Sequence, residues 1–160
     1  MNKSVKQSSL EERIIKLLTG KPLQAAQLLF EDEQLQAMQE YANIVSIKRL
    51  GYNDHGPVHM RKATYYSIKM FKLLHDAGIE MNLEKEHVGT ADDSLVSVLF
   101  ASLLHDLGMM ITRDQHEYLS IQLAVPIIDQ ILDKLYTNDE LLLKAAVRSV
   151  AIEGIFGHMA

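Results

Sequence analysis

The stretch "SLVSVLFASLLHDLGM", residues 94–109, decides the fold of this chain. Its first eleven residues place apolar side chains in every direction around a helix, with serine as the sole polar residue type. A helix that is apolar all round is buried, so this segment predicts the central helix of a helical bundle. The apolar run is too short to span a bilayer. At its end, His105 and Asp106 precede Gly108, which is expected to end the helix.

The rest of the 160-residue chain predicts one compact, all-α domain with about six helices. Apolar residues recur every three or four positions rather than every two, and the chain has three prolines. The first expected helix begins at a capping box at Ser9 and is closed by Gly20 and Pro22, and the second runs from 23 into the forties with a break at 31–33. The third runs from Pro57 to Gly78, and the fourth from a cap at Asp93 or Ser94 to Gly108. The fifth covers 114–136 with a split or kink at Pro126, and the sixth begins at 137. The polar segment 79–92 is expected to be a loop.

The charge and composition restrict the classes of partner. A net charge of −5 is opposite to that of a nonspecific nucleic-acid binder, so a small substrate is expected rather than a nucleic-acid polymer. The absence of cysteine excludes disulfides and thiolate ligands, and any metal must bind histidine and carboxylate groups. The N-terminus carries no apolar targeting segment, which predicts a cytoplasmic protein without a membrane anchor. The oligomeric state is left open.

A second copy of the same tetrapeptide occurs in "KLLHDAGI", residues 72–79. The helix before it carries basic side chains that predict a solvent-facing surface: Arg61, Lys62, Lys69 and Lys72. At such a helix end, His75 complements the helix dipole and Asp76 lies in the exit before Gly78. Helix capping and solvation therefore explain this copy without a functional site.

The copy at His105 and Asp106 follows a buried helix, and no lysine or arginine lies within one turn of it. A buried carboxylate needs a positive partner, and a metal ion would supply one. A buried His–Asp hydrogen bond without metal is the alternative. Four further histidines lie at expected helix ends, from which side chains can converge across a bundle: His55, His59, His116 and His158.

Four motifs in order resemble the HD-domain metal-dependent phosphohydrolases. "HGPVH" at 55–59 resembles the family's first motif, in which the second histidine binds metal, and His105-Asp106 resembles its signature pair. "HEYLS" at 116–120 and "VRSVAIEGIFGH" at 147–158 resemble motifs of the branch that binds two metal ions. The resemblance covers residues 51–158, so we expect an HD-like metal-binding core over 51–160. Residues 1–50 form an N-terminal helical segment without a motif.

The resemblance implies a ligand set and an activity. One divalent transition metal ion, from Mn, Fe, Co, Ni or Zn, would bind to His59, His105 and Asp106. A second would bind to His116 and His158, with Asp106 as the bridging carboxylate. Asp106 and His105 would then be the catalytic residues of a phosphohydrolase, which cleaves a phosphate ester with a metal-activated water. A nucleotide is one candidate substrate. Arg113 and Lys62 are the candidate residues for binding substrate oxygens.

Departures from the family pattern leave other functions open. The family's later aspartate has no counterpart after His158, which leaves open a truncated domain and predicts weak turnover. Asp129, Asp133 and Glu153 are conceivable substitutes, but they precede His158. Met109 stands where the signalling-nucleotide subgroup carries lysine, so a cyclic dinucleotide is not supported as substrate. An HD-fold di-iron oxygenase and a non-catalytic helical binding module remain as alternatives.

Overall fold

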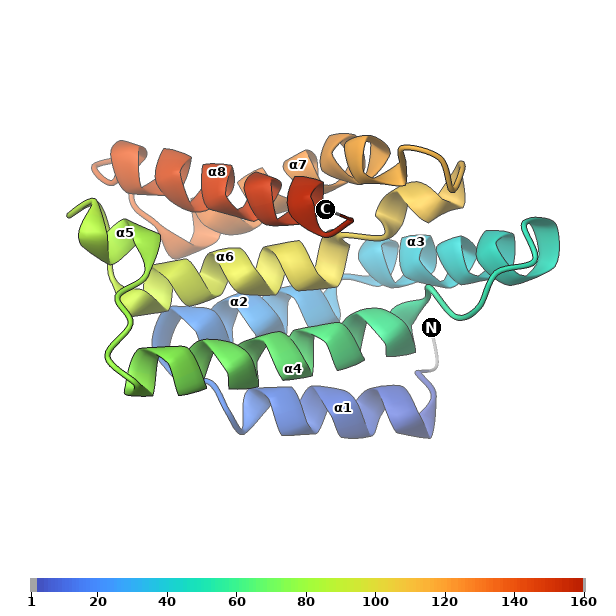
Figure 1. Ribbon diagram of the computed structural model, residues 1–160, viewed down its shortest axis with the longest axis horizontal. Coiled ribbons are helices and arrows are strands. Elements are labelled where there is room, and N and C mark those ends of the chain that lie inside the picture. Colours follow the sequence, from blue (N-terminus) through green and yellow to red (C-terminus); the bar gives the residue numbers. More distant parts are fainter. Residues whose placement is uncertain (1–2, 160) are drawn as a thin grey trace.

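The computed structural model describes residues 3–159, and all regular structure within that range is helical. The prediction of an all-α bundle is thereby confirmed. Eight α-helices form it, because the expected second helix divides in two and the expected 79–92 loop contains one helical turn, α5 (Asn82–Lys85). Helix α6 (Ala91–Leu104) is central and packs against α4 (Pro57–Asp76) and α8 (Leu141–Gly157) on either side (Figure 1).

The remaining helices surround this layer. Helix α1 (Val5–Ile15) packs on α4, and α2 (Gly20–Glu31) packs on α6. Helix α3 (Glu33–Ile44) continues into a π-helical turn, Val45–Arg49. Helix α7 (His116–Leu135) packs on α8 and on the 3-10 turn Leu107–Met110, which follows α6. The first fifty residues therefore share one hydrophobic core with the rest of the described chain.

Helix α6 is buried, as its composition predicts. Val96, Leu99, Phe100 and Leu104 are fully enclosed by neighbouring helices. The segment Ala91–Met110 is long and apolar enough to cross a membrane, but 78% of its most apolar window is buried inside the protein. This burial is that expected for the core helix of a helical bundle, so the segment is weak support for a membrane span.

The start of the chain differs from the sequence prediction. Helix α1 is capped by Ser4, whose Oγ accepts a hydrogen bond from the Gln7 N–H at 3.2 Å, so the predicted capping box at Ser9 is wrong. Ser9 lies inside the helix, because the cap forms one turn earlier than the Ser-x-x-Glu pattern suggested. Pro22 lies in the first turn of α2 rather than ending α1, since its missing N–H leaves no hydrogen bond unmade there.

The cap of α6 also lies earlier than predicted. Thr90 is the N-cap and forms a capping box with Asp93, in which each residue accepts from the other's backbone N–H. Asp93 additionally accepts a hydrogen bond from Tyr136 at 2.8 Å and lies 3.4 Å from the Lys21 ammonium. The predicted cap at Asp93 or Ser94 is wrong, because Asp93 is the third residue of this box. Its carboxylate ties α6 to α2 and to the end of α7.

Other helix boundaries agree with the sequence. Pro57 is the first residue of α4, and Asp32 separates α2 from α3. Gly78 follows α4 with a φ of +81°, a left-handed conformation that favours glycine. Pro126 lies inside α7, which continues unbroken from His116 to Leu135. Of the predicted split or kink at this proline, the split is therefore wrong, and the kink stays a prediction.

Candidate metal centre

The side chains of four histidines surround the carboxylate of Asp106, which is 2% exposed. Oδ2 of Asp106 lies 3.0 Å from His105 Nε2 and 3.2 Å from His59 Nε2. Oδ1 lies 3.2 Å from His116 Nε2 and 3.6 Å from His158 Nε2. Each carboxylate oxygen thus faces its own pair of imidazole nitrogens.

These five residues come from four separate parts of the chain. His59 lies in the first turn of α4, and His105 and Asp106 follow the last turn of α6. His116 is the first residue of α7, and His158 follows α8. The start of α4 and the ends of α6 and α8 lie at the same end of the bundle in Figure 1. The helix-end positions of the histidines are therefore what bring them together.

Gly108 brings the start of α7 against Asp106. Its N–H donates to the Ser120 hydroxyl at 2.8 Å. A Cβ atom at position 108 would lie 2.0 Å from the His116 carbonyl oxygen, which leaves space for glycine alone. Ser120, the small residue four positions after His116, therefore contacts Gly108 directly. This contact fixes the position of His116 beside Asp106.

Arg61 helps to join the ligand-bearing helices. It is buried, so its predicted position on a solvent-facing surface is wrong. Arg61 is 2% exposed, and its guanidinium donates to Glu11 at 2.6 Å and to the Gln39 side chain at 2.7 Å. The Gln39 amide in turn donates to the Leu103 carbonyl at 2.8 Å, two residues before His105. The basic residues around Arg61 concealed its burial. Its counter-charge is Glu11 on α1, and its amide partner is Gln39 on α3.

Three of the histidines use Nδ1 in the same way. Each Nδ1 lies within hydrogen-bond distance of the backbone carbonyl three residues earlier: His105 with Ser102 (3.0 Å), His116 with Arg113 (2.8 Å) and His158 with Ile155 (2.6 Å). A carbonyl oxygen only accepts, so each Nδ1 carries the proton. In the neutral ring, Nε2 then presents a lone pair toward the carboxylate. Metal-binding histidines are oriented by contacts of this kind.

Lone pairs and a carboxylate that converge without a cation repel one another. Oδ2 of Asp106 is buried without a hydrogen-bond donor, and Nε2 of His116 lies 3.0 Å from Nε2 of His158. Ligands bonded to one ion at about 2.1 Å lie about 3.0–3.4 Å apart, which is close to the separations observed here. The donor set therefore fits a metal ion better than it fits an isolated His–Asp hydrogen bond.

The pKa values of the cluster show the same demand for positive charge. Burial alone would raise the pKa of Asp106, but its contacts with the four histidines, which become hydrogen bonds when Nε2 carries a proton, hold it far below its usual range. The hydrogen bond to Asp106 raises the pKa of His59 and outweighs burial. Burial lowers the pKa of His158, but contacts with Asp106 and the Ile155 carbonyl outweigh it and raise the value. Without an ion, protons would compete for the same centre.

The cluster divides into two groups that could each hold a metal ion. His59, His105 and Asp106 form one group, and Asp106, His116 and His158 form the other. Within each group, ligand atoms lie within 4.8 Å of one another. Asp106 belongs to both, so its two oxygens could bridge neighbouring ions.

The two candidate substrate residues lie in different surroundings. The Arg113 guanidinium lies 3.4 Å from the His116 ring nitrogens and over the Tyr52 ring, at the edge of the metal centre. Lys62 lines a cavity between α1 and α4 with Arg13, and none of the five cluster residues lines that cavity. The structure thus brings Arg113 into contact with the site, whereas Lys62 lines the other cavity and acts on the cluster only through its charge, which opposes the rise in the pKa of His59 caused by Asp106.

The conceivable acidic substitutes do not reach the cluster. Asp129 pairs with Arg148 at 3.0 Å and Asp133 pairs with Lys144, both between α7 and α8. Glu153 is exposed on α8. Among residues 3–159, neither group of potential metal ligands contains these three carboxylates.

Three described histidines lie outside both groups: His55, His75 and His87. His75, from the other LLHD copy, is exposed at the opposite end of α4 from His59 and faces Glu84 at 3.6 Å. His55 lies beside His59, with 5.4 Å between ring centroids, and its Nδ1 contacts the Asn53 carbonyl. It is a neighbour of the centre rather than a member of either group.

No family model and no solved structure matches the chain. A curated protein of Methanocaldococcus jannaschii, described as uncharacterized, is 37% identical over 123 residues. The match covers 77% of this chain and 48% of that protein, so the chain spans about half the length of the curated relative it matches. This relative carries no functional description, and the function is therefore argued from the site.

Proposed function

We propose that this protein is a metal-dependent phosphohydrolase of the HD-domain type, which cleaves a small phosphate ester. The observation that carries the proposal is the position of Asp106, whose two oxygens each face a pair of histidine nitrogens. A bridging carboxylate with two histidine pairs is a ligand set for two neighbouring ions. The order of the sequence motifs supports the same family.

Each residue has a role in this proposal. Asp106 would hold both ions, His59 and His105 one of them, and His116 and His158 the other. When bound, a pair of ions about 3.5–4 Å apart lowers the pKa of a shared water and neutralises phosphate oxygens. Arg113, beside His116, would donate hydrogen bonds to a phosphate oxygen at the edge of the site. We propose a cytoplasmic location, which the burial of the apolar segment Ala91–Met110 inside the protein supports.

The same donor atoms also suit iron, which keeps a di-iron oxygenase as the second candidate. A set of four histidines and one carboxylate favours neither phosphate-ester hydrolysis nor oxygenation. Oxygen consumption by the iron-loaded protein would favour the oxygenase. Stoichiometric metal binding without turnover of either kind would leave a binding module.

The activity test compares the metal-loaded protein with two variants. The wild type should hydrolyse a generic phosphomonoester such as p-nitrophenyl phosphate, and a chelator should abolish the rate. Asp106→Asn should lower the rate at least 100-fold, because a bridging ligand is lost, while His75→Ala should retain it. Metal bound at one or two ions per chain without hydrolysis of any phosphate ester would reject the proposal.

A further inference from the structure

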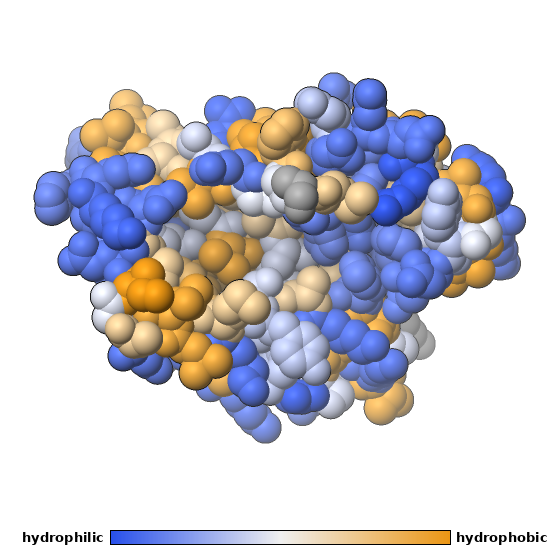
Figure 2. Space-filling model, in the orientation of Figure 1, coloured by the Kyte–Doolittle hydropathy of each residue, from blue (hydrophilic) through white to orange (hydrophobic). Residues whose placement is uncertain are grey.

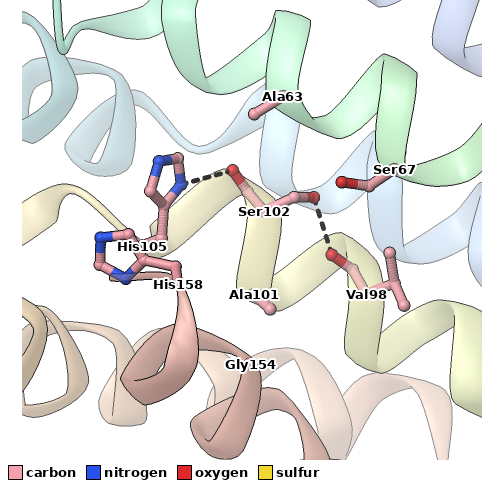
Figure 3. Close-up of a pocket in the computed structure, with 8 residues that line it drawn as sticks. All are labelled: Ala63, Ser67, Val98, Ala101, Ser102, His105, Gly154 and His158. Atoms are coloured by element: carbon pink, nitrogen blue, oxygen red, sulfur yellow. Dashed lines mark hydrogen bonds between the residues drawn. The ribbon is translucent and has the colours of Figure 1, made fainter. Parts of the chain in front are cut away.

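A groove leads from the metal centre along α6, between α4 and α8. Its first part is a cavity of about 230 Å³ whose wall includes His105 and His158, as Figure 3 shows. A second cavity of about 310 Å³ lies next to it along α6, with Val98 in the wall of both, and we call the two cavities together the groove. The lining residues of α6 extend from Ser94 to His105, which is a distance of roughly 16 Å along a helix.

Small side chains on three helices leave this space open. They are Ala63 and Ser67 on α4, Ala101 and Ser102 on α6, and Gly154 on α8. Helices α6 and α8 already approach closely, because a Cβ atom at Gly154 would lie 2.8 Å from the Ala101 Cβ. Gly154 and Ala101 thus allow the close approach of α6 and α8, and the small side chains of Ala63, Ser67 and Ser102 border the open space beside that contact.

The wall of the groove is neutral near the metal centre. The nearer cavity has no acidic or basic side chain apart from the two histidines. The Ser102 hydroxyl donates to the Val98 carbonyl at 2.7 Å, so its proton is already used (Figure 3). Such a wall offers little hydrogen bonding to a ligand.

The farther part of the groove is mainly apolar and contains Phe71, Ile79, Met81 and Val150, with Glu80 and Lys85 as charged members. Figure 2 shows apolar side chains gathered on this face, in the hollow beside α4 and over the C-terminal part of α4. A slender, uncharged, apolar group fits these surroundings.

We propose that the groove binds the hydrocarbon chain of the substrate, so that the enzyme acts on phosphomonoesters of unbranched aliphatic alcohols. This inference rests on the proposed function, because the metal centre would hold the phosphate. Two histidines that would bind the ions, His105 and His158, lie in the groove wall, so the chain of a metal-bound phosphate ester would have the groove beside it. A nucleoside fits less well, because the hydrogen-bonding side chains of the nearer cavity are limited to Ser67, Ser102 and the two histidines that would hold the ions.

The test measures binding rather than turnover. Isothermal titration calorimetry first gives the number of Mn²⁺ or Zn²⁺ ions bound, and the loaded protein is then titrated with ethyl-, butyl-, hexyl- and octylphosphonate. Burying a methylene completely strengthens binding about fourfold, and a groove open on one side buries about half of it. We therefore expect roughly a twofold gain in affinity per methylene, and weaker binding of adenosine monophosphate than of octylphosphonate.

Variants locate the effect in the groove. Ser67→Leu fills the space from α4 and should weaken octylphosphonate binding about tenfold while leaving ethylphosphonate unchanged. Val98→Thr keeps the shape but adds a hydroxyl group, and should reduce the gain per methylene even if Ser67→Leu folds poorly. Ser149→Leu, the same change on an exposed part of α8, is the control and should match the wild type.

The outcomes distinguish the assignment of the groove from the proposed metal-dependent activity. Equal affinity for ethyl- and octylphosphonate, or tighter binding of adenosine monophosphate, overturns the assignment of the groove and leaves the metal-dependent hydrolase intact. A chain-length gain that Ser67→Leu and Val98→Thr both leave unchanged also overturns it. Failure to bind any metal ion, or any phosphonate once metal is bound, overturns both.

Discussion

Asp106 is the central residue of the candidate metal site, because all four histidine contacts converge on its two oxygens. The other LLHD aspartate, Asp76, is exposed and is the last residue of α4, directly after His75. Identical tetrapeptides thus differ in what surrounds them, and the apolar or basic character of the preceding helix predicted this difference from sequence. Tertiary partners such as Glu11 and Gln39 could not be predicted, which is why Arg61 was misplaced on a solvent face.

The two LLHD copies provide a matched test within one chain. His105→Ala or Asp106→Ala should remove at least one bound ion, because each deletes a ligand from a site with few spare donors. His75→Ala or Asp76→Ala should leave the metal content unchanged and cost at most about 1 kcal/mol of unfolding free energy. Elemental analysis gives metal per chain, with folding checked by circular dichroism. Loss of metal in the His75 and Asp76 variants alone would show that the burial argument chose the wrong copy.

At the scale of elements, helix existence was predictable and helix ends were less so. The apolar run of α6, the proline at the start of α4 and the break at Asp32 are local signals, and the structure contains each of them. The caps at Ser4 and Thr90 competed with nearby serines and aspartates of similar capping ability, so local sequence could not rank them. The contact between Gly108 and α7 is long-range, and the motif pattern supplied its residues without its geometry.

The contact at Gly108 predicts a large effect from one methyl group. Gly108→Ala would place Cβ against the His116 carbonyl, and should destabilise the protein by about 3 kcal/mol and weaken the ion site of His116 and His158. Gly157→Ala is the control, since a Cβ there meets nothing within 4 Å and alanine favours a helix. Urea unfolding and metal titration measure the two effects. Equal stability of both variants would contradict the packing argument.

The cap of α6 predicts a pH-dependent effect of Tyr136. Burial would raise the pKa of Asp93, but hydrogen bonds from Thr90 and Tyr136 outweigh it and lower the value. Because the folded pKa lies below the unfolded one, this stabilisation is present above about pH 4 and is lost as pH falls. Tyr136→Phe should therefore cost about 2 kcal/mol at pH 7 and less at about pH 3.

The control for this cap is Tyr66→Phe, at a tyrosine that is 63% exposed, and it should change stability little at either pH. Denaturant unfolding at both pH values gives the comparison. A deficit in Tyr136→Phe that stays constant with pH would show that Asp93 is not the group responsible.

At the scale of the whole molecule, a metal ion in the candidate site would join helix ends that the hydrophobic core does not hold together. The first fifty residues and the ligand-bearing helices share a core, while the ligands come from α4, α7 and the segments that follow α6 and α8. The apolar pattern could predict the core, because burial follows from composition and period. It could not predict the groove, because an open space between helices depends on how three separate small-residue positions align.

This arrangement predicts that metal stabilises the whole fold. An ion that binds the folded chain alone adds about 2.7 kcal/mol at 100 times its dissociation constant, which for a domain of this size raises the melting temperature by roughly 5–10 °C. Asp106→Ala should melt at the same temperature with and without the ion, because the shared ligand is missing. Differential scanning calorimetry, with and without excess Mn²⁺ or Zn²⁺ after chelation and dialysis, measures the shift. Superimposable wild-type curves from protein shown by elemental analysis to be metal-free would mean that the five residues form no native metal site.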